Sequence, residues 1–245
     1  MKTFASVLYQ AYQERPDQVC IYLVQPGVED QPITYRELMT GAAAYAAALQ
    51  NRDIQPGEVV ILIQEHGLDL IHAYFGTVMH GAIPSIMPFL TEKLLPERYR
   101  ADLTALVSIT QPAAIVTYPE FEGEVKAALK PGDSVREVIN SAHVTRISVP
   151  DMSCMKGMDR SPQDIVLLQH SSGTTGLQKG VALSHQAVFN QLDNYSKTLC
   201  LSEDDVIVSW LPLYHDMGLI AGFLMPILLG VPLVLMSPFD WVRAP

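Results

Sequence analysis

Hydrophobic positions along the chain alternate between the spacing of helices and the spacing of strands. A Thr34-x-x-Glu37 capping box opens an alanine-rich segment, which predicts a helix through Gln50. A Pro-Gly turn follows, and the continuous apolar run Val59–Ile63 has the length of a strand. The first third of the chain therefore indicates helices alternating with strands.

The same alternation continues toward the end of the chain. Gly81 is expected to end a helix over residues 68–79, and the apolar run 103–109 leads into the next strand. Residues 149–163 lack a period and are expected to form a connection. The other expected helices are residues 120–129 and 184–199, and the other expected strands are residues 83–87, 113–117, 135–139, 165–169, 181–183 and 206–210.

These strands are continuously apolar rather than alternating, which predicts burial on both faces. We therefore expect an α/β fold of mostly parallel sheets layered with helices. Residues 217–236 contain no charged side chain and match the length of a membrane span. Glycines and prolines interrupt them, so we expect a helix, a turn and a buried strand, and no membrane span.

The acidic balance of the chain limits its partners. Lys and Arg total 16 against 26 Asp and Glu, a formal charge of −10, which disfavours broad binding of nucleic acid or anionic membranes. A small polyphosphate can still bind where backbone N–H groups, a metal and one lysine supply a local positive field. The three cysteines have no metal or redox spacing, and the N-terminus has no long apolar run, so a reducing cytoplasm is expected.

Residues 171–180 carry the strongest chemical signal. Their two inner glycines permit positive φ, so that successive N–H groups can converge on an anion, and Lys179 adds a positive charge. Gln178 precedes this lysine and a glycine follows it, so the loop is not a Walker A motif. From composition alone, a Ser/Gly/Thr turn without a ligand remains the alternative. The candidate polyphosphate contacts are Ser171, Ser172, Gly173, Thr174, Thr175, Gly176 and Lys179, and Thr174 is also the candidate magnesium contact.

This loop resembles the phosphate-loop signature of the adenylate-forming enzymes, which include acyl-CoA synthetases, fatty acyl-AMP ligases and peptide-synthetase adenylation domains. Residues 33–38, 57–60, 73–84 and 210–218 resemble further motifs of the superfamily, so the resemblance covers nearly the whole chain. It implies that residues 1–245 form the N-terminal part of the large AMP-binding domain. Two sub-lobes, 1–150 and 160–245, would join at 150–163, and the C-terminal lid domain would be absent. Gln178 departs from the proline or small apolar residue that is common there.

The resemblance also implies a reaction. Family members use ATP and Mg²⁺ to convert a carboxylic acid to an acyl-adenylate, which passes to the thiol of CoA or of an acyl carrier protein. It places His215 near the acid's carboxylate. The residue alone favours a partly buried histidine hydrogen-bonded to Asp216 or to backbone, and the flanking motif reverses that preference. The remaining histidines considered have no metal spacing and are expected to be structural: His66, His72, His80, His143 and His185.

The residues around His215 favour an apolar acid. Amino-acid adenylation domains usually carry a Phe-Asp pair here, whereas this chain has Leu213 to Met217 followed by an apolar run. A fatty or other apolar acid therefore fits better than an amino acid. Residues 210–218, together with Leu168 and Gln169, mildly favour the fatty acyl-AMP ligases within the family. The alternatives are an amino-acid adenylation domain and a non-catalytic nucleotide-binding or interaction module. A serine hydrolase using Ser171 or Ser172 ranks lower because the Gly-x-Ser-x-Gly elbow is lacking.

The family's adenine and ribose motifs and its lid lysine have no counterpart in the 245 residues. We therefore expect the chain by itself to be inactive in adenylation. We also expect exposed apolar surface near residues 233–239.

Overall fold

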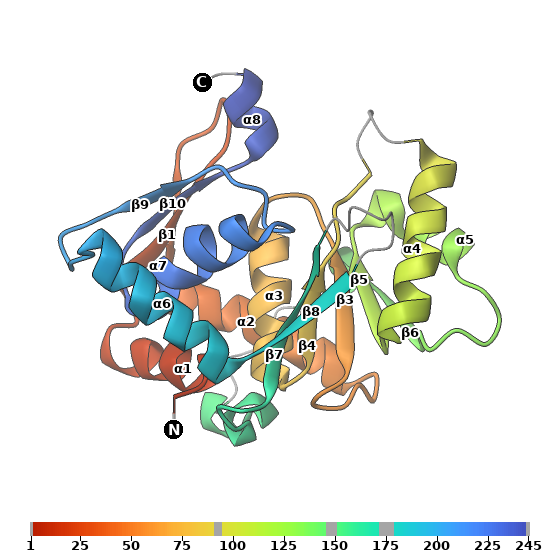
Figure 1. Ribbon diagram of the computed structural model, residues 1–245, viewed down its shortest axis with the longest axis horizontal. Helices are drawn as coiled ribbons and strands as arrows, with labels where there is room; N and C mark the ends of the chain where they lie inside the picture. Colours follow the sequence, from red (N-terminus) through yellow and green to blue (C-terminus); the bar gives the residue numbers. More distant parts are fainter. Residues whose placement is uncertain (1, 91–94, 146–150, 172–178, 244–245) are drawn as a thin grey trace.

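The computed structural model describes residues 2–90, 95–145, 151–171 and 179–243. Its strands form two four-stranded sheets and a two-stranded hairpin, shown with their helices in Figure 1. The helices are α1 (Phe4–Glu14), α2 (Tyr35–Gln50), α3 (Leu68–His80), α4 (Pro96–Thr110), α5 (Glu122–Ala128), α6 (His185–Leu199), α7 (Met225–Leu229) and α8 (Pro238–Arg243). The strands are β1 (Val19–Val24), β2 (Gln31–Thr34), β3 (Val59–Ile63), β4 (Ile83–Ile86), β5 (Ala114–Thr117), β6 (Glu137–Asn140), β7 (Ile165–Ser171), β8 (Lys179–Ser184), β9 (Ile207–Ser209) and β10 (Leu233–Met236).

One sheet has the order β4-β3-β5-β6 and is parallel throughout. Val60 and Leu62 of β3 point into the larger core, whereas Ile61 and Ile63 point into a second core beneath α4 and α5. Since both faces are covered, every residue of this strand can be apolar. The expected parallel α/β layering is confirmed.

The other sheet has the order β2-β1-β10-β9 and joins the two ends of the chain. Strand β1 pairs parallel with β10 in the register Ile21↔Leu233, and β2 is antiparallel to β1. Residues before position 150 and after position 160 thus share one sheet. A division at 150–163 therefore does not separate the two sheets.

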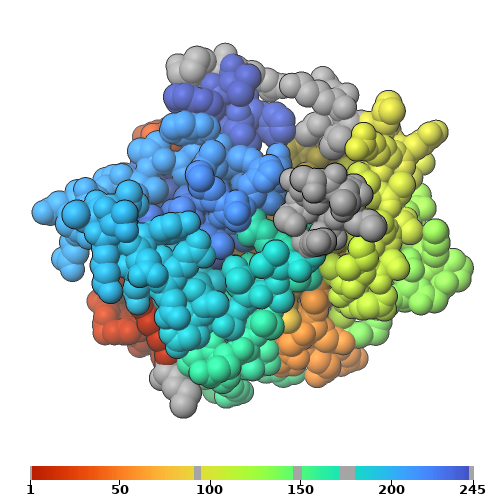
Figure 2. Space-filling model, in the orientation of Figure 1, coloured from red at the N-terminus to blue at the C-terminus, as the bar shows by residue number. Residues whose placement is uncertain are grey.

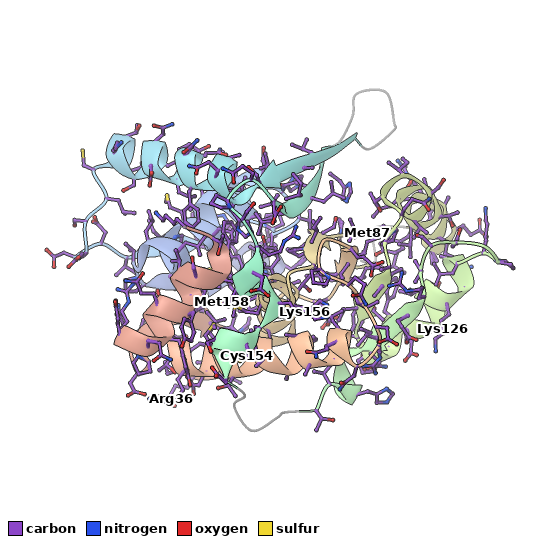
Figure 3. The ribbon with its side chains drawn as sticks, turned by 90° about the horizontal axis from the view of Figure 1, so that it is seen from below. Arg36, Met87, Lys126, Cys154, Lys156 and Met158 are labelled. Carbon is purple, nitrogen blue, oxygen red and sulfur yellow. The ribbon has the colours of Figure 1, made fainter. Side chains whose placement is uncertain are left out.

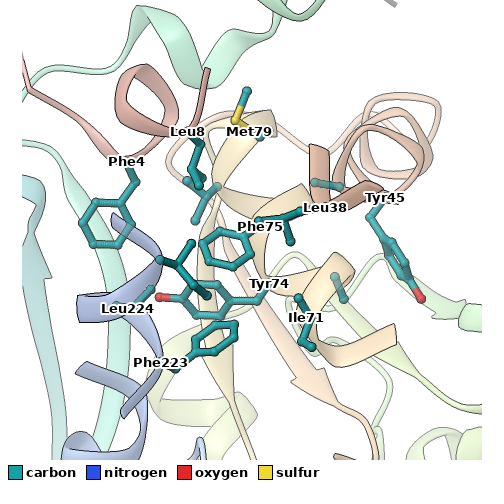
Figure 4. Packing of buried hydrophobic residues seen from close by; sticks show 14 of the residues in the cluster. Phe4, Leu8, Leu38, Tyr45, Ile71, Tyr74, Phe75, Met79, Phe223 and Leu224 are labelled. Carbon is teal, nitrogen blue, oxygen red and sulfur yellow. The ribbon is translucent and has the colours of Figure 1, made fainter. Parts of the chain in front are cut away.

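Helices α2 and α3 pack tightly against each other between the two sheets (Figure 1). The capping box of α2 is present, because Thr34 Oγ1 accepts from Glu37 N and the Glu37 carboxylate accepts from Thr34 N. Gly81 ends α3 with φ +86°, as predicted. Figure 4 shows the centre of the core, where the Tyr74 and Phe223 rings meet edge to face at 5.9 Å.

The expected connection after residue 150 consists of two 3-10 turns, Met152–Cys154 and Lys156–Asp159, the second of which contacts α1 and α3. Figure 3 labels Cys154, Lys156 and Met158 along this segment. Gly157 lies so close to the carbonyl oxygens of Val78 and Met79 that a Cβ would overlap both. The connection is therefore packed firmly against the end of α3.

Residues 217–236 form a π-helix (Met217–Leu224), helix α7 and the buried strand β10. The glycines and prolines of this segment predicted such an interruption. Within the described part of the chain, no helix is long and apolar enough to cross a membrane. The expectation of exposed apolar surface at residues 233–239 is wrong, because Leu233 and Leu235 are fully buried between β1 and β9.

The exposed apolar surface lies instead around β9, the edge strand of its sheet. Figure 2 shows this light-blue part of the chain at the left margin of the molecule. The side chains exposed there are Leu199, Val206, Val208, Trp210 and Met217. A groove of about 260 Å³ runs between this edge and the π-helix.

Candidate functional site

Strands β7 and β8 form an antiparallel hairpin that holds the two ends of the predicted phosphate loop. Ser171 and Lys179 are paired across it, and His170 is paired with Gly180. The structure therefore brings together the backbone of the first and last candidate contacts. The other candidate contacts, Ser172, Gly173, Thr174, Thr175 and Gly176, lie outside the described residues.

The base of this hairpin is bonded to the all-parallel sheet. His170 Nε2 lies 2.6 Å from Oγ of Ser85, a fully buried residue of β4. Burial lowers the pKa of His170, which favours the neutral ring. The Nδ1 atom of His170 is also buried and has no hydrogen-bond partner among the described residues. His170 had no predicted role from sequence, yet its bond to Ser85 holds the end of strand β7 in place.

His215 stands in a tight turn that precedes the π-helix. Its backbone N donates to Pro212 O at 3.1 Å, and its carbonyl accepts from Leu219 N at 2.8 Å. The residue is exposed, and its ring lies 5.0 Å from the Tyr214 ring, centroid to centroid. Asp216 accepts from Met217 N and so caps the helix. Backbone bonds thus fix the turn and leave the His215 ring at the surface.

Residues just before His215 line a cavity where the two sheets meet. Segments at the ends of β3, β4 and β10 supply its other walls, so the cavity lies where ligands bind in open parallel sheets. The cavity is small, with room for about one water (about 20 Å³), and it lies in a hollow of about 320 Å³ that includes open solvent. The lining residues are Gln64, His66, Leu70, Ile86, Met87, Phe89, Pro212, Leu213, Tyr214, Pro238 and Phe239.

Two polar side chains in this wall each have a buried nitrogen without a hydrogen-bond partner among the described residues. Gln64 is 3% exposed, and its Nε2 atom has no hydrogen-bond partner among the described residues. The same holds for Nε2 of His66, whose pKa burial lowers to about 4. From sequence, His66 was expected to be structural, and Gln64 had no predicted role. Their position directly after β3 is the signal that could have identified them, since strand ends build such sites.

Aromatic contacts connect α8 to both the cavity and the His215 segment. Phe89 and Phe239 meet at 5.6 Å, and Trp210 stacks on Trp241 at 4.4 Å with an angle of 16° between the rings. Figure 1 shows α8 at the end of the β1–β10 sheet. The C-terminal helix therefore closes one side of the cavity.

The structural histidines expected from sequence have structural contacts where these are described. His80 Nε2 lies 2.8 Å from Ile54 O, and His185 Nδ1 accepts from Phe4 N at 3.1 Å. Among the described residues, no group of three or more His, Cys, Asp or Glu side chains could hold a metal ion. Cys20, Cys154 and Cys200 are free thiols.

Known proteins share both sequence and fold with the chain. It is 29% identical to 4-coumarate-CoA ligase 1 of Narcissus pseudonarcissus over 97% of its own length and 44% of the relative's. It is 28% identical to a long-chain-fatty-acid–AMP ligase of Mycobacterium marinum, covering 100% of the chain and 42% of that protein. A crystal structure of the fatty acyl-adenylate ligase from L. pneumophila, in complex with acyl adenylate and pyrophosphate, superposes with a TM-score of 0.83 and 27% identity.

That superposition covers 99% of the chain and 41% of the ligase. The chain thus spans less than half the length of the relatives it matches. The family described as AMP-binding enzyme matches residues 8–245, nearly the full sequence, and the chain therefore belongs to the AMP-binding enzyme family of adenylate-forming ligases.

Proposed function

We propose that this chain is the part of an adenylate-forming ligase that binds the phosphates of ATP and the carboxylic acid. The acid is apolar, and the acyl-adenylate then passes to the thiol of CoA or of an acyl carrier protein. One observation carries the proposal: the 2.6 Å bond between His170 and Ser85. It joins the start of the phosphate loop to the strand that leads directly into Ile86 and Met87 of the cavity wall.

The chemistry needs positioning and charge neutralisation more than covalent help from the protein. A carboxylate oxygen of the acid attacks the α-phosphorus of ATP, and the bond to the bridging oxygen of pyrophosphate breaks. Negative charge grows on the departing pyrophosphate. Backbone N–H groups and hydroxyls of residues 171–176, with the ammonium of Lys179, would hold that charge.

His215 is the residue we propose to orient the acid. The proposal is supported by its turn, which adjoins Pro212, Leu213 and Tyr214 of the cavity wall, and by the exposure of the residue. The neutral or cationic ring can donate a hydrogen bond to a carboxylate oxygen. We assign His215 to holding the carboxylate and assign it no proton transfer.

Magnesium would be held mainly by the ATP phosphates. Mg²⁺ keeps several waters and takes few protein ligands at such sites, and a threonine hydroxyl is a suitable oxygen donor. Thr174 is the proposed contact. When bound, the ion neutralises the charge of the phosphate oxygens. A reducing cytoplasm, the proposed location, would keep the three cysteines as thiols.

The first test is equilibrium binding of Mg-ATP to the 245-residue chain and to its Lys179→Ala and Thr174→Ala variants. Loss of a charge-assisted bond to phosphate should raise the Kd for the lysine variant about tenfold or more. Lys197→Ala, which removes an exposed lysine of α6, is the matched control. An unchanged Kd in both loop variants would contradict the assignment of the phosphate loop.

The second test is acid-dependent ATP–pyrophosphate exchange across fatty, aryl and amino acids. The protein assayed is the product of the full reading frame, including any residues encoded after Pro245. Exchange with apolar acids, and its loss on Lys179→Ala, is the expected result. Exchange with amino acids alone would favour an amino-acid adenylation domain. ATP binding without exchange for any acid would favour a non-catalytic nucleotide-binding module.

A further inference from the structure

We infer that helix α8 is a lid over the cavity, and that it swings away from the β1–β10 sheet to admit the acid. The lid presupposes the proposed function and adds to it the step by which the acid enters. Three observations carry it: the small size of the cavity, the firm attachment of its other walls, and the aromatic contacts that hold α8.

The cavity in this structure is too small for the proposed acids. It has room for about one water (about 20 Å³), whereas a cavity that takes up benzene measures about 150 Å³. The surrounding hollow of about 320 Å³ includes open solvent, where an apolar body would remain in contact with water. Because protein interiors are close-packed, the space for a fatty or aryl acid has to come from the movement of a wall.

The walls formed by the strand ends and by the turn before His215 are fixed by backbone hydrogen bonds. Met87 follows β4, and its N donates to Leu62 O of β3 at 3.0 Å. Leu213 is 3% exposed and lies in the turn that is closed by the bond from His215 N to Pro212 O. Moving either wall would therefore break hydrogen bonds of the sheet or of the turn.

The remaining wall, helix α8, is held to the rest of the molecule through aromatic rings. Among the described residues, its backbone hydrogen bonds outside the helix go only to Ser237, which lies between β10 and α8. Phe239 meets Phe89 at 5.6 Å between ring centroids, and the Trp241 ring stacks on Trp210 at 4.4 Å. Such a ring pair shifts an equilibrium by only about two- to tenfold. Helix α8 can therefore turn about Ser237 without breaking a described hydrogen bond to another element.

The two ring pairs have different places in this lid. Phe239 lines the cavity and fills space that the acid would take, whereas Trp241 is not among the lining residues. With the acid in the place of Phe239, α8 remains displaced and Trp241 remains separated from Trp210. The tryptophan stack therefore follows the lid without touching the acid.

The first test follows the stack in the 245-residue chain, whose two tryptophans are Trp210 and Trp241. Two stacked indole rings give an exciton couplet in circular dichroism, and Trp241→Ala identifies this signal by removing it. Saturation with octanoic acid or phenylpropanoic acid should abolish most of the couplet, because the rings separate. Acetic acid has no apolar body to place in the cavity, and it should leave the couplet unchanged.

The second test uses Trp241→Ala to distinguish a lid from a fixed wall. The variant removes the stack without changing the cavity lining, so it should increase the open fraction of the unliganded chain. The apparent Kd for octanoic acid, measured by isothermal titration calorimetry, should fall about two- to tenfold, the range of one ring pair. As a control, Tyr195→Ala removes an aromatic side chain of α6 that is 39% exposed, and it should leave the Kd unchanged.

An unchanged couplet at saturating acid would overturn the lid, and this holds even if Trp241→Ala does not fold. An apparent Kd that stays the same or rises in a folded Trp241→Ala would also overturn it, because α8 would then be a fixed wall. Both results leave the proposed function standing, since the acid still binds. If neither acid binds to the chain, the lid is overturned, and exchange by the product of the full reading frame decides separately whether the proposed function fails.

Discussion

The imidazole of His170 and the hydroxyl of Ser85, 85 positions apart in sequence, form a 2.6 Å hydrogen bond between the β7–β8 hairpin and strand β4. Both side chains are buried or half-buried, and β4 and β7 lie side by side along this contact. The bond is therefore a point at which the β7–β8 hairpin is held against the parallel sheet. Its removal should affect stability and ATP binding together.

Ser85→Ala and His170→Leu should each lower the free energy of unfolding by about 1–2 kcal/mol, because each leaves a buried polar atom without its partner. In a double-mutant cycle measured by urea denaturation, the coupling should be about 1 kcal/mol. As a control, Thr198→Ala removes the exposed hydrogen bond from Thr198 Oγ1 to Asn194 O in α6. It should change the free energy of unfolding by less than about 0.5 kcal/mol. Strictly additive effects of Ser85→Ala and His170→Leu would show that the contact contributes nothing.

Gly76 allows α3 to approach α2 at van der Waals distance. A Cβ built on it would lie 2.5 Å from Tyr45 Cβ and 2.6 Å from the backbone oxygen of Ala42. Gly76→Ala should therefore destabilise the protein by about 1–3 kcal/mol, although alanine is the better helix former by about 1 kcal/mol. Thermal and urea unfolding measure the change.

Gly123 provides the matched control, since it lies in α5 and a Cβ there would meet nothing within 4 Å. Gly123→Ala should leave stability unchanged or raise it by about 0.5–1 kcal/mol. If Gly76→Ala were equally harmless, the close packing of α2 on α3 would be refuted.

The sequence predicted those elements whose signals are local. Val59–Ile63 was identified correctly because a turn bounds an uninterrupted apolar run, and both faces of β3 are in fact buried. Thr34 and Gly81 carry capping preferences that depend only on nearby backbone groups, and both cap helices as expected. The α/β class followed from these elements.

Features that depend on distant partners were not predicted. Strand β1 was missed, and its pairing with β10 joins residues more than two hundred positions apart, which no local pattern encodes. The apolar runs of β7 and β8 predicted two strands, but they did not predict that these strands pair antiparallel with each other. The place of His66 in the cavity wall was not predicted, because residues at the ends of β4 and β10 build the rest of that wall. The exposed apolar surface was assigned to β10, whereas β10 is an inner strand and β9 is the edge.

Acid should destabilise the fold through His185. The residue is 2% exposed, its Nδ1 accepts from Phe4 N, and burial together with Arg160 lowers its pKa to about 4. Unfolded His185 has a pKa of about 6.5, so as the pH falls below 6.5 the unfolded chain binds a proton that the folded chain does not. The stability that depends on neutral His185 is therefore complete above pH 6.5 and is lost as the pH falls toward 4.

The slope from this one group approaches about 1.4 kcal/mol per pH unit within that interval. His185→Asn retains an acceptor but does not titrate, so its stability relative to the unmutated chain should rise as the pH falls from 6.5 to 4. Urea denaturation at several pH values gives both curves, and the contributions of His66 and His170 cancel in the difference. A difference independent of pH would contradict a depressed pKa for His185.

Strand β9 should make the isolated chain self-associate through its open edge. It pairs with β10 on one side, and the described residues place no strand on the other. Val208 is 52% exposed on this edge, beside Met217, which is 66% exposed. An unpaired edge with apolar side chains is a template for pairing with another chain.

Val208→Lys should reduce concentration-dependent association, measured by sedimentation velocity or light scattering, because a lysine ammonium resists burial in a strand-to-strand contact. It should change the free energy of unfolding by less than about 1 kcal/mol, since the side chain is half-exposed. Val28→Lys introduces the same charge at a turn where the valine is 60% exposed, and it separates the effect of the edge from that of net charge. If both variants associate like the unmutated chain, the β9 edge is not the contact. If both reduce association equally, net charge rather than the edge controls it.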